Sequence, residues 1–354
     1  MVRIAVIPGD GIAHEVVPEA VKVLETADQL FHIGLDYELF DFGVEHYLKT
    51  GKVVPDDFDV FLNALPASFD AVLFGAGGID PRLPKGMNAQ RVLSGLRRGL
   101  DLYANVRPCK LLDSSITPLK GKTERDLDFV VIRENTEGYG GGTAGRFKVG
   151  TADEVEIRPE YNTYKGVRRV VEFAFEFARA NQRTDVVMAQ KGMDDGLWHR
   201  VFFDVAGKYT GMTARQMHVD TIAYTMIVAP EQLQVIVAEN RAGDILSDIG
   251  GALQGSRGIA PTGCFNAEGK FCYFEPVHGT GPDIIGQQIA NPLAAIRAGG
   301  MLLAHFGHRD AADAIEAAAS QVVKTGRVTR DLSGNLSTLQ VGEAVRDALR
   351  HLAG

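Results

Sequence analysis

The chain has 354 residues, of which 45% are hydrophobic and 23% charged, with a formal net charge of −8 at pH 7. This length exceeds one ordinary hydrophobic core and indicates two domains or one large α/β unit. The composition is that of a soluble globular protein, and no apolar run reaches the roughly 18 residues that a membrane span requires. The acidic balance, without a run of Lys or Arg, argues against nucleic acid as a partner. An anionic ligand would therefore need a local cluster of arginines.

The N-terminal sequence and the cysteines bear on the cellular compartment. Residues 1–7 lack the series of basic lead, long apolar stretch and cleavage signal that marks a secretory peptide. Cys109, Cys264 and Cys272 form no CxxC pair and are odd in number. We therefore expect reduced thiols and a cytoplasmic location.

Short β-branched runs alternate with longer amphipathic segments along the chain, which is typical of a mostly parallel sheet covered by helices. Buried strands are predicted at Val2–Ile7, Ala71–Phe74, Phe129–Ile132, Val186–Met188 and Val235–Val237. A helix is predicted after the first strand, because Val17, Val21 and Leu24 share one helical face. Further helices are predicted at Tyr164–Arg179, Leu197–Lys208, Asp244–Leu253, Pro292–Phe306, Asp310–Val323 and Val341–Leu352.

One glycine-rich stretch formally matches a nucleotide-binding motif. The six residues Gly140–Gly145 fit the pattern GxGxxG. That motif requires a helix to begin within it, whereas the following Arg146–Gly150 has no helical periodicity. We interpret the stretch as a flexible loop or hairpin. The chain has no Walker A sequence, so a nucleotide would bind on another scaffold.

The strongest local signal is Asn240–Asp248, which follows the predicted strand Val235–Val237 and leads into a helix. Four helical residues rotate a side chain by about 400°, so Asp244 and Asp248 lie on one face, a turn apart. Two such carboxylates repel unless a cation or proton lies between them, and oxygen ligands favour Mg²⁺ or Mn²⁺. The simpler interpretation is that Asp244 complements the helix dipole and Asp248 is solvated. Asp220 could supply a third carboxylate or serve only as a turn or cap residue.

Three arginines are candidates for binding an anion. Arg107 and Arg133 lie at or beside the ends of predicted strands, where α/β proteins place ligands, and Arg97 precedes them in the chain. A forked guanidinium binds a carboxylate through two hydrogen bonds. A single arginine is usually a surface ion pair, but three at such places in an acidic protein suggest a carboxylate site.

Lys191 and Tyr139 are candidates for proton transfer. Lys191 follows the apolar strand Val186–Ala189 and precedes Gly192. A lysine at a strand end is usually solvated, whereas one drawn into a cleft can act as a base. Tyr139, among glycines, could donate a proton or be an ordinary loop aromatic. The sequence leaves both choices open.

A polar, glycine-rich segment late in the chain, Glu275–Asp283, is followed by Asn291. Glycines beside small polar residues let backbone amides approach a phosphate or an adenosine closely. Asp283 could accept both hydroxyl hydrogens of a ribose diol and would repel a 2′-phosphate. An ordinary surface loop would explain the glycines but not the density of polar groups.

Taken together, five segments resemble motifs of the β-decarboxylating dehydrogenases, the family of isopropylmalate, isocitrate, homoisocitrate, tartrate and D-malate dehydrogenases. In family order they are Ile7–Ile12, Ala104–Pro108, Arg133–Gly138, Gly243–Asp248 and Glu275–Gly279. The resemblance covers nearly the whole chain. It implies an α/β, isopropylmalate-dehydrogenase-like two-domain fold with a central mixed, largely parallel sheet, flanking helices and no Rossmann fingerprint. It further implies a discontinuous cofactor-binding domain, residues 1–102 plus 255–354, and a substrate, metal and dimerisation domain, residues 103–254.

The resemblance also implies roles for single residues in binding the acid and the metal. Arg97, Arg107 and Arg133 are expected to bind the carboxylates of a malate-like acid. Mg²⁺ or Mn²⁺ is expected to bind Asp220, Asp244 and Asp248. Lys191 and Asp220 are expected to enter the site from the second subunit of an obligate homodimer.

For the cofactor, the resemblance implies NAD rather than NADP, because NADP-specific relatives place Lys-Tyr where this chain has Asp283-Ile284. The adenosine half of the cofactor is expected to bind the late polar segment. The expected residues are Glu275, His278, Gly279, Thr280, Gly281, Asp283, Ile284 and Asn291.

The implied reaction is the oxidation of a 2-hydroxy acid followed by its decarboxylation. The metal lowers the pKa of the hydroxyl, and Lys191, through water and Asp220, takes the proton as hydride leaves for the nicotinamide. The 2-keto acid loses CO₂ because the metal stabilises the enolate. Tyr139 then helps to protonate the enol carbon.

Three departures from the family pattern bear on the substrate. Tyr139 comes one position early, and the stretch from Lys191 to Trp198 is about one helical turn short. Near Arg97, Leu93-Ser94 replaces an apolar Leu-Leu pair. A polar wall disfavours a branched hydrocarbon, so the leading hypothesis is a malate with a small or polar C3 substituent, such as tartrate, D-malate or a specialised biosynthetic analogue.

Other functions remain open at this point. Within the family, isopropylmalate, isocitrate or homoisocitrate are alternative substrates. A non-catalytic regulatory paralogue would dimerise and bind nucleotide without turnover. A simple 2-hydroxy acid dehydrogenase would need no metal and release no CO₂.

Overall fold

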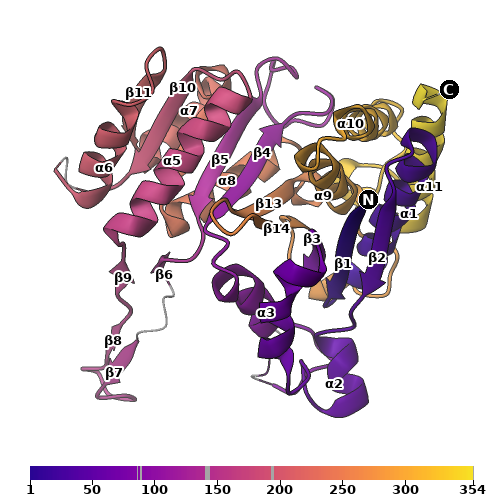
Figure 1. The fold of residues 1–354 in the computed structure, drawn as a ribbon, viewed down its shortest axis with the longest axis horizontal. Helices are drawn as coiled ribbons and strands as arrows, with labels where there is room; N and C mark the ends of the chain where they lie inside the picture. The colour runs from indigo at the N-terminus through magenta and orange to yellow at the C-terminus, as the bar shows by residue number, and fades with distance from the viewer. Residues whose placement is uncertain (86, 88–89, 140–143, 193–194, 354) are drawn as a thin grey trace.

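A ten-stranded sheet forms the centre of the molecule (Figure 1), in a computed structural model that describes residues 1–85, 87, 90–139, 144–192 and 195–353. The strand order is β11-β10-β12-β5-β4-β13-β14-β3-β1-β2. The pairs β5–β4, β4–β13 and β13–β14 are antiparallel and the other pairs are parallel, which confirms the expected mixed, largely parallel α/β fold. The strands are β1 Val2–Gly9, β2 Leu35–Leu39, β3 Ala71–Ala76, β4 Ala104–Lys110, β5 Asp128–Glu134, β10 Asp185–Gln190, β11 Thr213–His218, β12 Val235–Ala238, β13 Pro261–Asn266 and β14 Phe271–Pro276.

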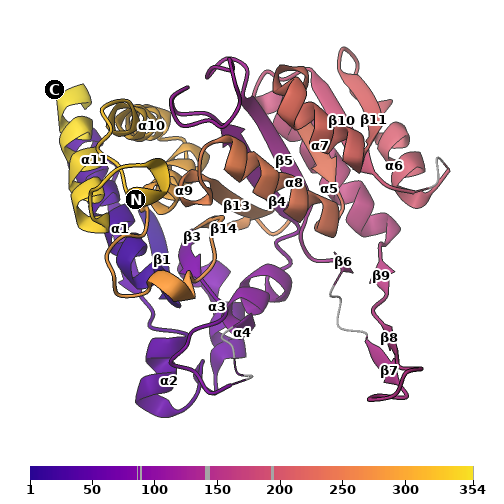
Figure 2. The ribbon, with the colours of Figure 1, turned by 180° about the vertical axis from the view of Figure 1, so that it is seen from behind.

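Helices cover both faces of this sheet, as the two opposite views show (Figures 1 and 2). The α-helices are α1 Ala13–Phe31, α2 Val44–Thr50, α3 Phe58–Ser68, α4 Gln90–Ser94, α5 Tyr164–Ala180, α6 Leu197–Ala206, α7 Val219–Val228, α8 Asn240–Leu253, α9 Leu293–His305, α10 Arg309–Lys324 and α11 Thr338–Ala353. Shorter helical turns are η1 Gly95–Gly99, η2 Pro230–Gln232, η3 Arg257–Ile259, η4 Pro282–Ile284 and η5 Arg330–Leu332. Among the described residues, no helix combines the length and the apolar character needed to cross a bilayer.

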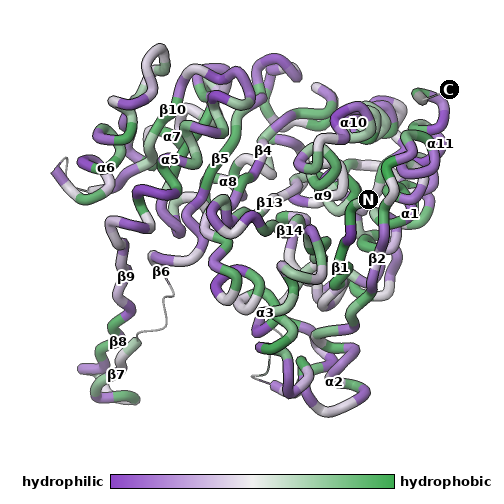
Figure 3. Tube along the Cα trace, in the orientation of Figure 1, coloured by the Kyte–Doolittle hydropathy of each residue, from purple (hydrophilic) through white to green (hydrophobic). Residues whose placement is uncertain are grey.

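In one half of the sheet, alternate residues of each strand pack against helices on opposite faces. Val186 and Met188 of β10 join a core cluster with α5 and α6, whereas Val187 and Ala189 join a cluster with α7 and α8. Strands buried on both faces become continuous apolar runs, which is why the sequence pattern located β5, β10 and β12 correctly. Figure 3 shows this hydrophobic character along β5 and β10.

The other half of the sheet is packed in the same way. Ile4 and Val6 of β1 contact a cluster that includes α1, α9, α10 and α11, and Ala5 and Ile7 contact the cluster of α3. The core clusters thus fall mainly on either side of the border between β4 and β13. The division into residues 1–102 plus 255–354 and residues 103–254 remains a prediction, because one sheet runs through both parts.

A narrow arm projects from the α5 end of the molecule (Figures 1 and 2). It consists of two antiparallel pairs, β6 (Gly138–Tyr139) with β9 (Glu160–Tyr161) and β7 (Gly145–Phe147) with β8 (Val155–Ile157). Residues 140–143 of the GxGxxG match lie outside the described residues. The chain continues from Gly145 as a strand, so the stretch does not open a helix as a Rossmann motif would.

The structure corrects three details of the sequence interpretation. Helix α8 begins at Asn240 rather than Asp244, because the Glu239 carboxylate accepts the Arg241 and Ala242 backbone N–H groups at 2.7 and 2.6 Å. Arg107 lies in the middle of β4 rather than at its end. Asp220 belongs to the first turn of α7, a helix that the sequence pattern did not reveal.

Close packing of α8 on β4 generates a stability prediction. A Cβ added at Gly250 of α8 would lie 2.1 Å from the buried Cys109 Sγ of β4. We expect Gly250→Ala to lower the free energy of unfolding by about 1–3 kcal/mol, although alanine favours a helix over glycine. Urea denaturation measures the effect.

The control is Gly207→Ala, at the end of α6, where φ is −57° and an added Cβ would meet its nearest atoms at 3.6 and 3.7 Å. That variant should match or slightly exceed the unaltered protein in stability. Equal urea midpoints for both variants would contradict the tight contact between α8 and β4.

Candidate active site

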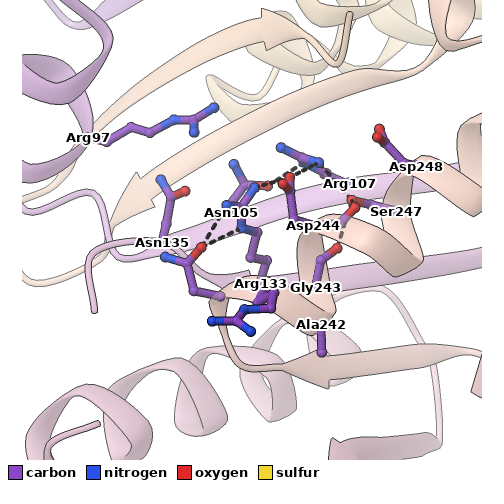
Figure 4. Close-up of polar contacts among 12 residues, drawn as sticks. Arg97, Asn105, Arg107, Arg133, Asn135, Ala242, Gly243, Asp244, Ser247 and Asp248 are labelled. Atoms are coloured by element: carbon purple, nitrogen blue, oxygen red, sulfur yellow. Dashed lines mark hydrogen bonds and ion pairs between the residues drawn. The ribbon is translucent and has the colours of Figure 1, made fainter. Parts of the chain in front are cut away.

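Most of the charged residues singled out in the sequence line one cavity of about 240 Å³. Segments from distant parts of the chain meet there: β3 and the loop after it, α4 and η1, β4, β5, α8, η3, and β14 with the loop after it. Figure 4 shows Arg107 of β4 and Arg133 of β5 meeting Asp244 of α8, while Arg97 and Asp248 lie farther out. The charged lining residues are Arg97, Arg107, Arg133, Asp244, Asp248, Arg257 and Glu275.

Arg107 of β4 is buried and makes three hydrogen bonds through Nε and Nη1 (Figure 4). Its Nε donates to Asn105 Oδ1 at 2.9 Å, and its Nη1 donates to Ser247 Oγ at 2.7 Å and to Asp244 Oδ1 at 3.1 Å. Asn105 and Arg107 are two residues apart on one strand, so their side chains share a face of the sheet. The arrangement directs the guanidinium at the acidic face of α8.

Arg133 of β5 reaches the same carboxylate. Its Nη1 donates to Asp244 Oδ1, and its Nε and Nη2 donate to Asn240 Oδ1 at 3.3 and 2.7 Å. A Cβ at Gly243 would lie 2.7 Å from the Arg133 Cβ, so only glycine lets α8 approach this closely. Burial, reinforced by the positive charge of Arg107, lowers the pKa of Arg133 to about 10, and Asp244 only partly opposes this shift. Two guanidinium groups therefore share one carboxylate.

Arg97 of η1 contacts a different acid. Its Nε donates to the Tyr273 hydroxyl at 2.7 Å and its Nη2 to Glu275 Oε1 at 2.6 Å, while Tyr273 donates to the same carboxylate oxygen at 2.9 Å. Burial alone would lower the pKa of Arg97, but the negative charge of Glu275 outweighs the effect of burial and raises this pKa. Glu275, which the resemblance assigned to the cofactor, is thus the ion-pair partner of a predicted acid-binding arginine.

Asp244 and Asp248 offer oxygen ligands suited to a hard dication. They lie one turn apart on α8, line the cavity, and have side chains about half exposed, at 52% and 48%. Within the described ranges, no three His, Cys, Asp or Glu side chains come close enough together to hold a metal ion. The pair therefore fits part of a cation site.

Lys191 and Asp220 lie apart from the arginine cavity. Lys191 follows β10 and its Nζ is 2.7 Å from Asp220 Oδ2 of α7, with both side chains 64% exposed. The hydrogen bond from Lys191 lowers the pKa of Asp220. Lys191 lines a second cavity of about 740 Å³ together with Trp198 and Glu239. One chain alone does not bring this pair to the three arginines.

Tyr139 lies on the arm and does not line the arginine cavity. Its side chain is exposed, its hydroxyl accepts a hydrogen bond from Arg158 Nη1 at 3.2 Å, and the Arg241 guanidinium lies 4.3 Å from its ring centre. Its catalytic role remains a prediction.

The loop after β14 places two of the expected cofactor residues, His278 and Gly279, on the wall of the arginine cavity. Nδ1 of His278 is 2.9 Å from the Gly279 carbonyl oxygen, and the buried Nε2 has no hydrogen-bond partner among the described residues. Burial lowers the pKa of His278, which favours a neutral imidazole. Thr280 Oγ1 donates to the Ile79 carbonyl at 2.6 Å and secures the loop. The unpartnered Nε2 suits a polar group of a ligand.

The remaining expected cofactor residues follow this loop without lining the arginine cavity. Gly281 has a φ of +53°, and Asp283 is exposed on η4, next to Ile284. Asn291 is buried: its Oδ1 accepts the Leu293 N–H at the start of α9, and its Nδ2 donates to Asp331, both at 3.0 Å. These residues thus lie outside the wall of the arginine cavity, along the chain that leads into α9.

Sequence reasoning missed five residues of this site. Asn105 and Asn240 were detectable, because they stand two residues before Arg107 on a strand and four before Asp244 on a helix. Ser247, Tyr273 and Arg257 carry no comparable local signal.

Comparison with known proteins agrees with this geometry. The family model "Isocitrate/isopropylmalate dehydrogenase" matches residues 3–345. The chain is 39% identical to D-malate dehydrogenase [decarboxylating] of Escherichia coli, over 97% of each chain, and 38% identical to tartrate dehydrogenase/decarboxylase of Pseudomonas putida, over 99% and 98%. It is 40% identical to 3-isopropylmalate dehydrogenase of Clavibacter sepedonicus, over 98% of each.

Among solved structures, isocitrate dehydrogenase of Methylococcus capsulatus is similar, with a TM-score of 0.87 and 32% identity over 99% of this chain and 100% of that chain. The match of the family model over nearly the whole chain, together with these relatives, shows that the protein belongs to the isocitrate/isopropylmalate dehydrogenase family.

Proposed function

We propose that the protein catalyses the NAD-dependent, divalent-metal-dependent oxidation and decarboxylation of a malate-type 2-hydroxy acid whose C3 substituent is small or polar, as in tartrate or D-malate. The observation that carries this proposal is the gathering of Arg97, Arg107 and Arg133 beside Asp244 and Asp248 in one cavity. The names of the D-malate and tartrate relatives support the same substrate class.

The arginines supply binding for the acid. Arg107 and Arg133 together carry two positive charges, and the Asp244 carboxylate that they share neutralises only one of them. A substrate carboxylate placed between them gains two charge-assisted hydrogen bonds and relieves their mutual repulsion. The buried asparagines and Ser247 fix both guanidinium groups in advance, which reduces the entropy lost on binding.

Lys191 and Asp220 carry out the proton transfer. When bound by Asp244 and Asp248, a hard dication supplies Lewis-acid activation of the hydroxyl and stabilises negative charge at the enolate oxygen. Asp220, within hydrogen-bond distance of Lys191, keeps the ammonium oriented and can pass a proton between it and water.

For the cofactor, we favour NAD. The exposed carboxylate of Asp283 can accept hydrogen bonds from both ribose hydroxyls and would repel a 2′-phosphate. The free Nε2 of His278 offers a further polar contact beside this loop.

A shared site between two copies would supply the missing third carboxylate. Helices α7 and α8 expose large apolar side chains, which soluble monomers rarely gather on adjacent helices. The exposed fractions are 66% for Tyr224, 51% for Ile227, 50% for Val228 and 56% for Ile245. Pairing these faces in a homodimer would bring Lys191 and Asp220 of one copy toward the arginine cavity of the other.

The three cysteines are free and buried, which fits a location in the cytoplasm.

3-Isopropylmalate is the alternative substrate, with isocitrate and homoisocitrate. Leu93, rather than Ser94, lines the arginine cavity, so the wall near Arg97 is more apolar than the sequence suggested. A branched hydrocarbon would gain from burial against this leucine.

The proposal is tested with a panel of D-malate, tartrate, 3-isopropylmalate and isocitrate, each with NAD and Mn²⁺, with and without EDTA. We expect NADH and CO₂ from D-malate or tartrate, with EDTA abolishing both. NADH without CO₂ and without sensitivity to EDTA would indicate a simple 2-hydroxy acid dehydrogenase. If no acid gives NADH or CO₂ although the protein still binds NAD, the protein is a non-catalytic paralogue.

The role of Arg133 is tested by Arg133→Gln, which keeps a hydrogen-bond donor for Asn240 but removes the charge. Binding of D-malate, measured by calorimetry, should weaken about ten- to hundredfold, because a charge-assisted contact is lost. The control is Arg146→Gln on the arm, which removes the same positive charge from a side chain that is 56% exposed. Equal affinities in both variants would argue against the carboxylate role.

The shared site is tested by mixing two inactive variants, Lys191→Ala and Asp248→Asn. After denaturation and refolding together, half of the dimers should combine one copy of each and hold one intact site out of two. About one quarter of the unaltered activity should therefore return. No recovery, with light scattering showing mixed dimers, would place all of these residues in a site built from one chain.

A further inference from the structure

Arg257 is a fourth arginine on the cavity wall, and it has no role in the proposed binding of the acid or in proton transfer. It opens the short turn η3, between α8 and β13, where Ser256 Oγ accepts the Gly258 N–H at 2.9 Å. A Cβ at Gly251 of α8 would lie 3.2 Å from the Arg257 Cγ, so a glycine there makes room for the arginine stem. The backbone turn and the helix surface therefore position this side chain.

The guanidinium of Arg257 is only weakly engaged. Its Nη1 lies 3.6 Å from Asp248 Oδ2, and the side chain is 62% exposed. An ion pair of this length and exposure contributes little to stability. The other three arginines of the cavity are each within hydrogen-bond distance of a buried partner. If Asp248 binds a dication, Arg257 is left free to pair with another anion.

Arg257 lies near the loop that carries the expected cofactor residues. Both Arg257 and His278 line the cavity, and the positive charge of Arg257 acts on the pKa of His278. The adjoining Gly258 is so close to Asn291 that an added Cβ would lie 2.8 Å from the Asn291 Cβ. Arg257 thus shares a cavity with His278 and Asp248, and its neighbour Gly258 packs closely on Asn291.

A dinucleotide carries a diphosphate with two negative charges, and the proposed NAD site would have to accommodate them. The expected cofactor residues Glu275, His278, Gly279, Thr280, Gly281, Asp283, Ile284 and Asn291 include no lysine or arginine. Beyond the GxGxxG match, the chain continues as strand β7 from Gly145 and does not open the helix that binds the diphosphate in a Rossmann domain. A cation near His278 would meet this need.

We propose that Arg257 is a cofactor-binding residue whose guanidinium pairs with a diphosphate oxygen of the dinucleotide. This inference rests on the proposed use of NAD. The forked guanidinium can donate to a phosphate oxygen while the η3 backbone stays in place. In the absence of cofactor, Asp248 is its ion-pair partner.

The test compares ADP-ribose with adenosine, both measured by calorimetry at one fixed Mg²⁺ concentration. In Arg257→Leu, the affinity for ADP-ribose should fall about ten- to hundredfold while that for adenosine stays unchanged, because only ADP-ribose carries the diphosphate. Arg257→Lys keeps the charge without the fork and should give an intermediate loss. In turnover, the KM for NAD should rise while the KM for the acid and kcat stay nearly constant.

The matched control is Arg350→Leu, which removes the same charge from α11, where the side chain is 52% exposed and pairs with Asp347. It should leave both affinities unchanged. Equal losses for ADP-ribose and adenosine in Arg257→Leu, or no loss at all, would overturn the diphosphate contact while leaving the proposed function intact. Failure of the unaltered protein to bind either ADP-ribose or NAD would overturn the proposed NAD dependence and this inference together.

Discussion

The carboxylate of Asp244, shared by Arg107 and Arg133, is the interaction on which the site depends. It joins a helix to two antiparallel strands of the central sheet. Each guanidinium is buried, and burial of a charge is costly unless hydrogen bonds replace the lost water. Asn105, Asn240 and Ser247 provide those bonds.

This arrangement leaves the cavity with more positive than negative charge. Two guanidinium groups share one carboxylate, and burial, reinforced by the positive charge of Arg107, lowers the pKa of Arg133. Stability and binding are therefore in conflict: the free protein retains unbalanced charge that an anionic ligand would neutralise. The same imbalance explains how a chain with a net charge of −8 can present a site for a multiply charged acid.

Glycines allow the close approach that the site requires. Gly243 lets α8 lie against Arg133 of β5, and Gly250 lets it lie against Cys109 of β4. With a Cβ at either position, the helix would move outward, and Asp244 would lose the geometry that both arginines share. The acidic residues and the glycines of α8 therefore form one structural unit.

The sequence alone determined the fold class, because strands buried on both faces and amphipathic helices leave local patterns of hydrophobicity. It also paired Asp244 with Asp248, since helical spacing places them on one face. The proximity of Arg97, Arg107, Arg133 and Asp244 was decided by the tertiary structure, as was the pairing of Arg97 with Glu275. These contacts join residues separated by more than 100 positions, and no local periodicity records which strand lies beside which helix.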